Sequence, residues 1–173
     1  MGTCLPRADV TLSKPGRTAL VGMGNPAHGD DGIGPVVARQ VYGLLPNKAD
    51  IDLLEHAASG FSLAERLVGF ERAVIIDALV DAREEVGTVA RVEFADESGG
   101  SLLGFHTAGF HDILALARTL GFEVPSSIVA FGVVIREPQT FSENLSAELT
   151  ARLPQIVNAV LAEVLQMYGT AES

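Results

Sequence analysis

Short apolar runs alternate along this chain with stretches in which apolar residues recur at helical spacing. The runs at residues 17–23, 73–79 and 127–135 are almost continuously apolar, which is typical of strands buried on both faces. Residues 32–45 instead carry an apolar side chain every three or four positions, as one face of a helix does. The remaining predicted elements are strands at 50–55 and 88–94 and helices at 59–68, 109–120 and 146–168.

The order of these elements predicts an α/β fold. Alternating helices and near-continuously apolar strands form a doubly wound, mostly parallel, twisted sheet with helices on both faces. We expect five strands, one of them antiparallel, and the alternation at 88–94 is typical of a half-exposed edge strand. Pro154 falls inside the last predicted helix, where we expect it to interrupt the helix or to lie near a new start. Residues 17–168 then form one domain between tails at 1–16 and 169–173.

Composition and charge narrow the class of protein. The 173 residues are 47% hydrophobic and 20% charged, a globular composition of about one domain. Because no apolar run approaches the roughly 20 residues that cross a membrane, we expect no membrane span. The net charge of −10 disfavours a nucleic-acid partner, whose phosphates demand a basic surface. The one cysteine, Cys4, allows neither an intrachain disulfide nor a cysteine-based metal site, so we expect a reducing, cytoplasmic location.

Three polar residues stand where an active site belongs in such a sheet. Doubly wound folds bind ligands at the carboxyl ends of the strands, where the direction of winding reverses. Asp31 follows the first strand, Asp77 lies at the carboxyl end of the third strand inside its apolar run, and His106 precedes a helix. If the first and third strands are neighbours, the two aspartates face each other and His106 can complete the set. Such oxygen and nitrogen ligands suit nickel or zinc, which polarises a peptide carbonyl and activates a bound water.

Each of these residues also has an ordinary structural interpretation. One of the two acids before the first helix is expected to cap it, and we assign that role to Asp30 rather than to Asp31. Asp77 could be a hydrogen-bonded carboxylate that steadies a loop, since a buried acid needs compensation. His106 could be an ordinary loop histidine, and of the others only His28 is close enough to the first turn to contact a substrate. Sequence position alone leaves both interpretations open.

Four segments, taken in order, resemble the maturation proteases of nickel–iron hydrogenases. The first, residues 22–34 (GMGNPAHGDDGIG), has a G-x-G-N turn, an acidic pair and a G-x-G. Residues 73–80 resemble the family's third strand, and residues 106–112 (HTAGFHD) its histidine segment ahead of a helix. Residues 131–138 resemble its last strand and the Glu-containing loop that follows. The resemblance extends over about residues 17–165, and the ordered set is more specific than any single motif.

This resemblance implies a reaction and a set of residues. The family's metal-binding positions fall on Asp31, Asp77 and His106, although Asp31 is shorter than the glutamate often found there, which implies a metal closer to the backbone or a looser geometry. The implied activity is a metal-dependent endopeptidase that removes the C-terminal extension of a nickel-loaded [NiFe] hydrogenase large-subunit precursor. Nickel would come with this substrate, and no nucleotide is implied. The residues expected to contact the substrate are Gly24, Asn25, His28 and Gly32.

Three other functions compete with this interpretation. Residues 22–27 satisfy a relaxed dinucleotide-binding fingerprint, and Glu55 ends the second strand where a ribose-binding acid belongs. Asp30 and Asp31, however, put two negative charges at the helix start that a pyrophosphate needs bare. Peptidyl-tRNA hydrolases share only the G-x-G-N-P stretch and are normally basic. A non-catalytic chaperone of hydrogenase assembly is an alternative that the sequence does not separate from a protease.

Overall fold

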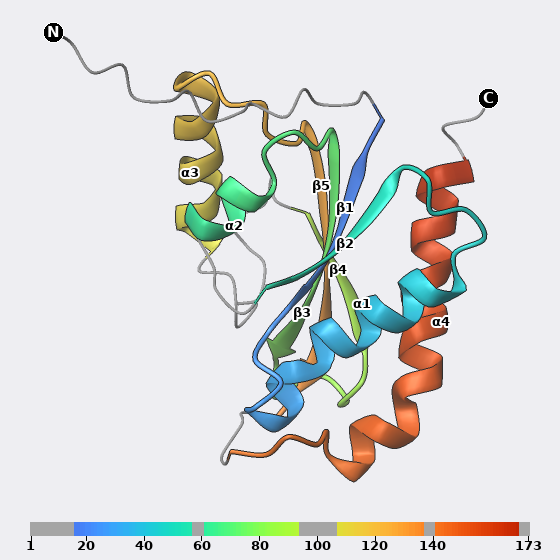
Figure 1. The fold of residues 1–173 in the computed structure, drawn as a ribbon. Helices are drawn as coiled ribbons and strands as arrows, with labels where there is room; N and C mark the ends of the chain where they lie inside the picture. The colour runs from blue at the N-terminus through green and yellow to red at the C-terminus, as the bar shows by residue number, and fades with distance from the viewer. Residues whose placement is uncertain (1–15, 57–60, 94–106, 137–140, 170–173) are drawn as a thin grey trace, which may run out of the picture.

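The predicted α/β architecture is present in the computed structural model, which describes residues 16–56, 61–93, 107–136 and 141–169 (Figure 1). In chain order its elements are β1 (Thr18–Met23), the 3₁₀ turn η1 (Gly29–Gly32), α1 (Ile33–Leu44), β2 (Ile51–His56), α2 (Phe61–Arg66), β3 (Arg72–Val80), β4 (Val89–Glu93), α3 (Thr107–Thr119), β5 (Ser127–Ile135) and α4 (Ala147–Gly169). The strands lie in the order β2-β1-β3-β5-β4, with β4 antiparallel to β5 and the other pairs parallel. The predicted five-stranded sheet with one antiparallel edge strand is therefore confirmed.

Each strand supplies side chains to two separate apolar cores, because successive side chains point to opposite faces of a sheet. In β3, Val74 and Ile76 pack in the core that is closed by α1 and α4. Ile75 and Leu79 pack in the core on the opposite face, which is closed by α2 and α3. Figure 1 shows the two helical layers on opposite sides of the sheet, as the predicted doubly wound fold requires.

The last helix, α4, continues through Pro154, so the predicted interruption is wrong. A proline inside a helix removes one backbone hydrogen bond and strains the preceding turn. Leu149 before the proline, and Ile156 and Val160 after it, are all buried in the same core. Their burial against the sheet holds both halves of α4 in one helix.

The ends of the predicted domain lie close to the ends of the described structure. α4 extends to Gly169, one residue past the predicted domain end. The predicted N-terminal tail, residues 1–16, lies outside the described residues apart from Gly16. Within the described ranges, none of the helices is long and apolar enough to span a membrane.

Candidate functional site

The candidate site begins with a tight reversal of the chain between β1 and α1. At Gly24 the backbone φ is +126°, which L side chains rarely adopt, and a Cβ atom there would collide with the carbonyl oxygen of Asp31. A Cβ atom on Gly34 would lie 2.1 Å from the carbonyl oxygen of Met23 and 2.5 Å from that of Ile76. The start of α1 therefore packs directly on the end of β1 and on β3. This close contact brings the acidic pair that precedes α1 to the carboxyl edge of the sheet.

Two of the glycines predicted to contact the substrate are needed by the loop itself. The space beside Gly24 is filled by the backbone of Asp31, and the space beside Gly32 by Pro26, whose Cα atom lies 2.8 Å from a Cβ atom built on Gly32. Both positions thus exclude a side chain because the chain packs on itself. Contact of Gly24 and Gly32 with a substrate stays a prediction.

Asp31 closes the loop that leads from β1 into η1. Its Oδ2 atom accepts a hydrogen bond of 2.9 Å from the backbone N–H of Asn25. The Oδ1 atom of Asn25 in turn accepts one of 3.0 Å from the N–H of Ala27, which stabilises the turn as asparagine commonly does. Across the described ranges, the one hydrogen bond that Asp31 accepts with its side chain is this bond to Oδ2. Asn25 orients the acid, and the loop holds it partly buried.

Asp77 lies inside β3 at the level where β1 ends, rather than at the end of its own strand as predicted. The pairing of β1 with β3 ends with Gly22 opposite Ile76, one residue before Asp77. β3 continues to Val80 because β5 provides a ladder partner over its whole length. The carboxylate of Asp77 is fully buried, and its Oδ1 atom accepts a hydrogen bond of 2.8 Å from the N–H of Ala78. Strand alternation directs it to the face covered by α2 and α3.

The third predicted ligand, His106, lies outside the described residues. α3 begins at the next residue, Thr107, and runs back toward the start of β5, so its N-terminal end is directed toward the carboxyl edge of the sheet (Figure 1). In the part of the chain that the structure describes, no group of three or more His, Cys, Asp or Glu side chains is placed to hold a metal ion. The set of Asp31, Asp77 and His106 stays a prediction, and its requirement that β1 and β3 be neighbours is met.

The loop after β1 is fastened to the segment that precedes α4. The N–H of Gly29 donates to the carbonyl of Ser142 at 2.6 Å, and the N–H of Ser142 donates to the carbonyl of Ala27 at 3.1 Å. These bonds pair His28 with Ser142 in a short parallel bridge. No local pattern in the sequence signals the pairing of two distant loops, so residues 141–146 were not predicted as neighbours of the site.

Asp30 does not cap the first helix, so that prediction is wrong. Neither η1 nor α1 has a side-chain hydrogen bond at its N-cap. The Oδ1 atom of Asp30 instead accepts a hydrogen bond of 2.6 Å from the backbone N–H of Ser146, whose hydroxyl caps α4 by accepting from the N–H of Leu149 at 3.3 Å. The 3₁₀ turn ahead of α1 is responsible, because it separates Asp30 from the start of that helix. Asp30 therefore ties the loop that carries Asp31 to the start of α4.

Replacing Asp30 by alanine should lower the free energy of unfolding by about 1 kcal/mol, since it removes one hydrogen bond that joins two loops. Asp30→Asn keeps the Oδ1 acceptor and should retain most of that stability. Urea unfolding of both variants measures the difference. Glu143→Ala, an exposed acid in the same segment, is the control and should change little. Equal stability of Asp30→Ala and the wild type would show that the tie contributes nothing.

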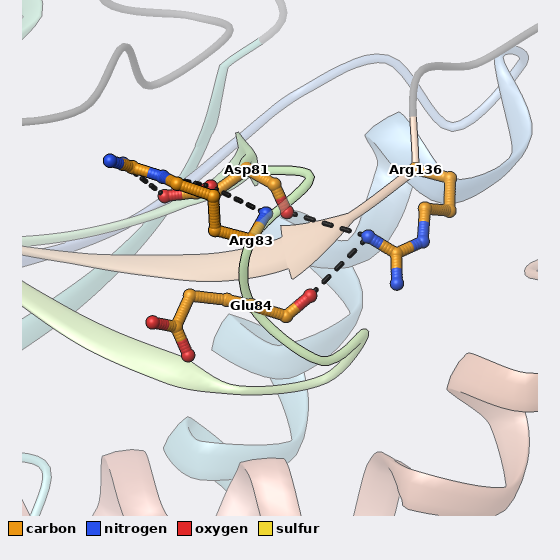
Figure 2. A network of polar contacts seen from close by, with 4 residues as sticks. All are labelled: Asp81, Arg83, Glu84 and Arg136. Atoms are coloured by element: carbon orange, nitrogen blue, oxygen red, sulfur yellow. Dashed lines mark hydrogen bonds and ion pairs between the residues drawn. The ribbon is translucent and has the colours of Figure 1, made fainter.

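A second polar cluster lies beyond the ends of β3 and β5 (Figure 2). The Nη1 atom of Arg136 donates to the backbone carbonyls of Asp81 and Glu84, at 3.5 and 3.3 Å. The side chain of Arg83 holds the carboxylate of Asp81 through hydrogen bonds of 3.0 and 2.8 Å. These bonds lower the pKa of Asp81 to about 2, so this partly buried carboxylate stays ionised at neutral pH. We interpret the cluster as a brace for the loop between β3 and β4.

Comparison with known proteins decides the family. The sequence profile of a family described as hydrogenase maturation protease matches residues 36–163. The chain belongs to the hydrogenase maturation protease family. This maturation protease is 28% identical over 153 residues to the hydrogenase expression/formation protein HupD of Thiocapsa roseopersicina, with 87% of this chain and 68% of that relative covered. The HupD protein of Rhodobacter capsulatus is 24% identical over 154 residues, with 87% and 72% covered.

Solved structures agree with this assignment of the maturation protease. The [NiFe] hydrogenase maturation protease HybD from Thermococcus kodakarensis is 26% identical and superposes with a TM-score of 0.64, covering 86% of this chain and 98% of that one. The hydrogenase maturating endopeptidase HybD from E. coli shares the fold with a TM-score of 0.64 at 23% identity, with 87% and 93% covered. The predicted family and the predicted enzyme class, an endopeptidase of hydrogenase maturation, are confirmed.

Glu55, the acid that would bind the ribose in the dinucleotide-binding alternative, already has a partner in the structure. The carboxylate of Glu55 accepts two hydrogen bonds from the guanidinium of Arg39 on α1, at 2.5 and 2.8 Å. The hydrogen bonds from Arg39 lower the pKa of Glu55, which keeps the pair charged. In this maturation protease Glu55 is thus engaged in joining β2 to α1.

Proposed function

We propose that this protease removes the C-terminal extension from a nickel-loaded precursor of a [NiFe] hydrogenase large subunit. We further propose that Asp31, Asp77 and His106 bind the nickel that the substrate carries. The observation that supports this most strongly is the adjacency of β1 and β3, since Asp31 follows β1 and Asp77 lies one residue beyond the last β1–β3 pair. Membership of the maturation protease family and the names of the hydrogenase-related relatives support a hydrogenase precursor as substrate.

The chemistry of the donor set fits a nickel ion. Two carboxylates and one imidazole supply oxygen and nitrogen ligands, which suit a divalent transition metal. A cation beside the buried carboxylate of Asp77 offsets the cost of keeping its charge away from water. Asp31 is held by the N–H of Asn25 through one oxygen, so the loop orients its other oxygen before the substrate arrives. Nickel is in this proposal part of the substrate and serves as the feature that the protease recognises.

Peptide hydrolysis at this edge needs no covalent nucleophile from the chain. A water molecule adds to the carbonyl carbon of the scissile bond, the carbon–nitrogen bond breaks, and the released amine takes up the proton that the water loses. A divalent metal at the site polarises the carbonyl and lowers the pKa of the water. We expect the carboxylate of Asp31 or Asp77 to accept the proton from the water and to pass it to the released amine. We place the reaction in the cytoplasm, because the one cysteine of the chain suits a reducing compartment.

The decisive experiment incubates the purified protein with nickel-loaded large-subunit precursor and follows the precursor mass. We expect C-terminal shortening with the wild type, and a loss of roughly a hundredfold or more with His106→Ala, because a metal ligand contributes several kcal/mol. Nickel-free precursor is the control and should stay uncut. Undiminished cleavage by His106→Ala would contradict the ligand set. Binding of the precursor without cleavage by the wild type would favour an assembly chaperone.

A further inference from the structure

Phe141 presents an almost fully uncovered aromatic ring beside the candidate site. Its exposed fraction is 85%, the largest of any bulky hydrophobic residue in the described part of the chain. One edge-to-face contact supports the ring, with the centroids of Phe141 and His28 4.6 Å apart and their planes at 76°. The ring therefore has a defined direction while most of its apolar surface remains open to contact.

The aromatic pair is held firmly at the edge of the sheet where the acids lie. Ser142, the residue after Phe141, exchanges backbone hydrogen bonds with Ala27 and Gly29 on either side of His28. His28 itself lies three residues before Asp31 on the same short loop. Phe141 is thus fixed by its neighbours to the loop that carries a predicted ligand, although it is far from that loop in sequence.

We propose that Phe141 and His28 form a subsite that receives an apolar side chain of the substrate polypeptide close to the bond that is cut. The inference rests on the proposed function for the identity of the substrate and adds a specificity-determining residue, Phe141. An endopeptidase must hold an extended segment of its substrate beside the catalytic groups, and covering an exposed aromatic ring is a source of binding free energy.

The charge around the aromatic pair favours an apolar occupant over an acidic one. Asp30 and Asp31 lie on the loop that carries His28, and Glu143 lies two residues after Phe141. An acidic side chain of the substrate would be repelled by these carboxylates, whereas an apolar side chain gains from burying the ring. The subsite therefore selects against acidic residues as well as for apolar ones.

The same molecule offers a matched control at the opposite edge of the sheet. Phe122 is also exposed, with a fraction of 50%, but it follows α3 in the connection that leads to the start of β5. The carboxyl ends of the parallel strands are at the other edge. Replacing Phe122 therefore tests whether substrate binding depends on any exposed aromatic residue or only on the one beside the site.

Phe141→Ala should raise the KM for the nickel-loaded precursor by roughly tenfold, which is what losing most of one buried aromatic contact costs. We expect kcat to change by less than about twofold, because the ring does not touch the reacting atoms. Phe141→Leu should restore most of the affinity, and Phe122→Ala should leave both constants unchanged. Equal melting temperatures for all three variants exclude a general loss of structure. An unchanged KM for Phe141→Ala overturns the proposal.

A cleavage-independent measurement separates this proposal from the proposed function. Phe141→p-benzoylphenylalanine, a photoreactive replacement, should crosslink to an apolar residue near the C-terminal extension of the precursor, as mapped by mass spectrometry, and the same replacement at Phe122 should not. A crosslink that maps elsewhere on a precursor that the wild type cleaves overturns the subsite alone. If the wild type leaves the precursor uncut, the proposed function fails, and the crosslink still reports whether Phe141 touches the substrate tail.

Discussion

Replacing Asp77 by asparagine should stop cleavage of the hydrogenase precursor while the fold remains intact. Asparagine has the same shape as aspartate, and its Oδ1 atom can still accept the hydrogen bond that the N–H of Ala78 donates. What it lacks is the negative charge that we propose binds the nickel ion. Because a divalent ion contributes several kcal/mol to the stabilisation of the transition state, kcat/KM should fall by a factor on the order of 10³. Mass spectrometry of the precursor over time measures the loss.

Asp81→Asn is the matched control for this experiment. Asp81 follows β3 directly, but its carboxylate is partly buried and held by Arg83 rather than directed into the face beside α2 and α3 (Figure 2). We expect its activity to stay within about twofold of the wild type, because Asp81 belongs to the brace of the loop between β3 and β4 and not to the candidate site. Circular dichroism and thermal unfolding should show both variants folded. If Asp77→Asn is folded and cleaves the precursor at the wild-type rate, Asp77 is not a metal ligand.

Replacing Gly34 by alanine should strongly destabilise the protein, although it adds only one methyl group at the candidate site. The added methyl group would meet the carbonyl oxygens of Met23 and Ile76, which belong to the backbone of two adjacent strands and have little room to move. α1 would have to shift away from the sheet, so we expect the free energy of unfolding to fall by about 3 kcal/mol or more. The same shift displaces Asp31, and cleavage should decline in the fraction that still folds. Urea unfolding measures the first effect.

Gly43→Ala separates this steric effect from the helix propensity of alanine. Gly43 lies near the end of the same helix, and a Cβ atom there would have no neighbour within 4 Å. Alanine should therefore stabilise α1 by about 0.5 to 1 kcal/mol. The two alanine substitutions in this one helix are expected to change the free energy of unfolding in opposite directions. If Gly34→Ala is as stable as the wild type, α1 does not pack on β1 and β3 as closely as the structure shows.

The hydrophobic pattern determined the fold of this protein to a large extent. The predicted strand at 127–135 coincides with β5, and the strands around Asp77 and Glu55 differ from β3 and β2 by about one residue at either end. Continuous apolar runs identify strands that are buried on both faces, and such strands pair in parallel under covering helices. The half-exposed alternation likewise marked β4 as an edge strand. These patterns are local, so they can be read without knowledge of any distant residue.

The sequence also determined which residues are candidates for chemistry, through the acidic pair, the acid inside an apolar strand and the ordered motifs of the family. Only the tertiary structure decided what surrounds them. Asp30 bonds to Ser146, 116 residues away, instead of capping the helix that follows it. Phe141 packs against His28, and β3 extends past Asp77 because β5 is long enough to pair with it. Local patterns report which face of an element is buried, whereas contacts between distant loops depend on where the assembled sheet places their ends.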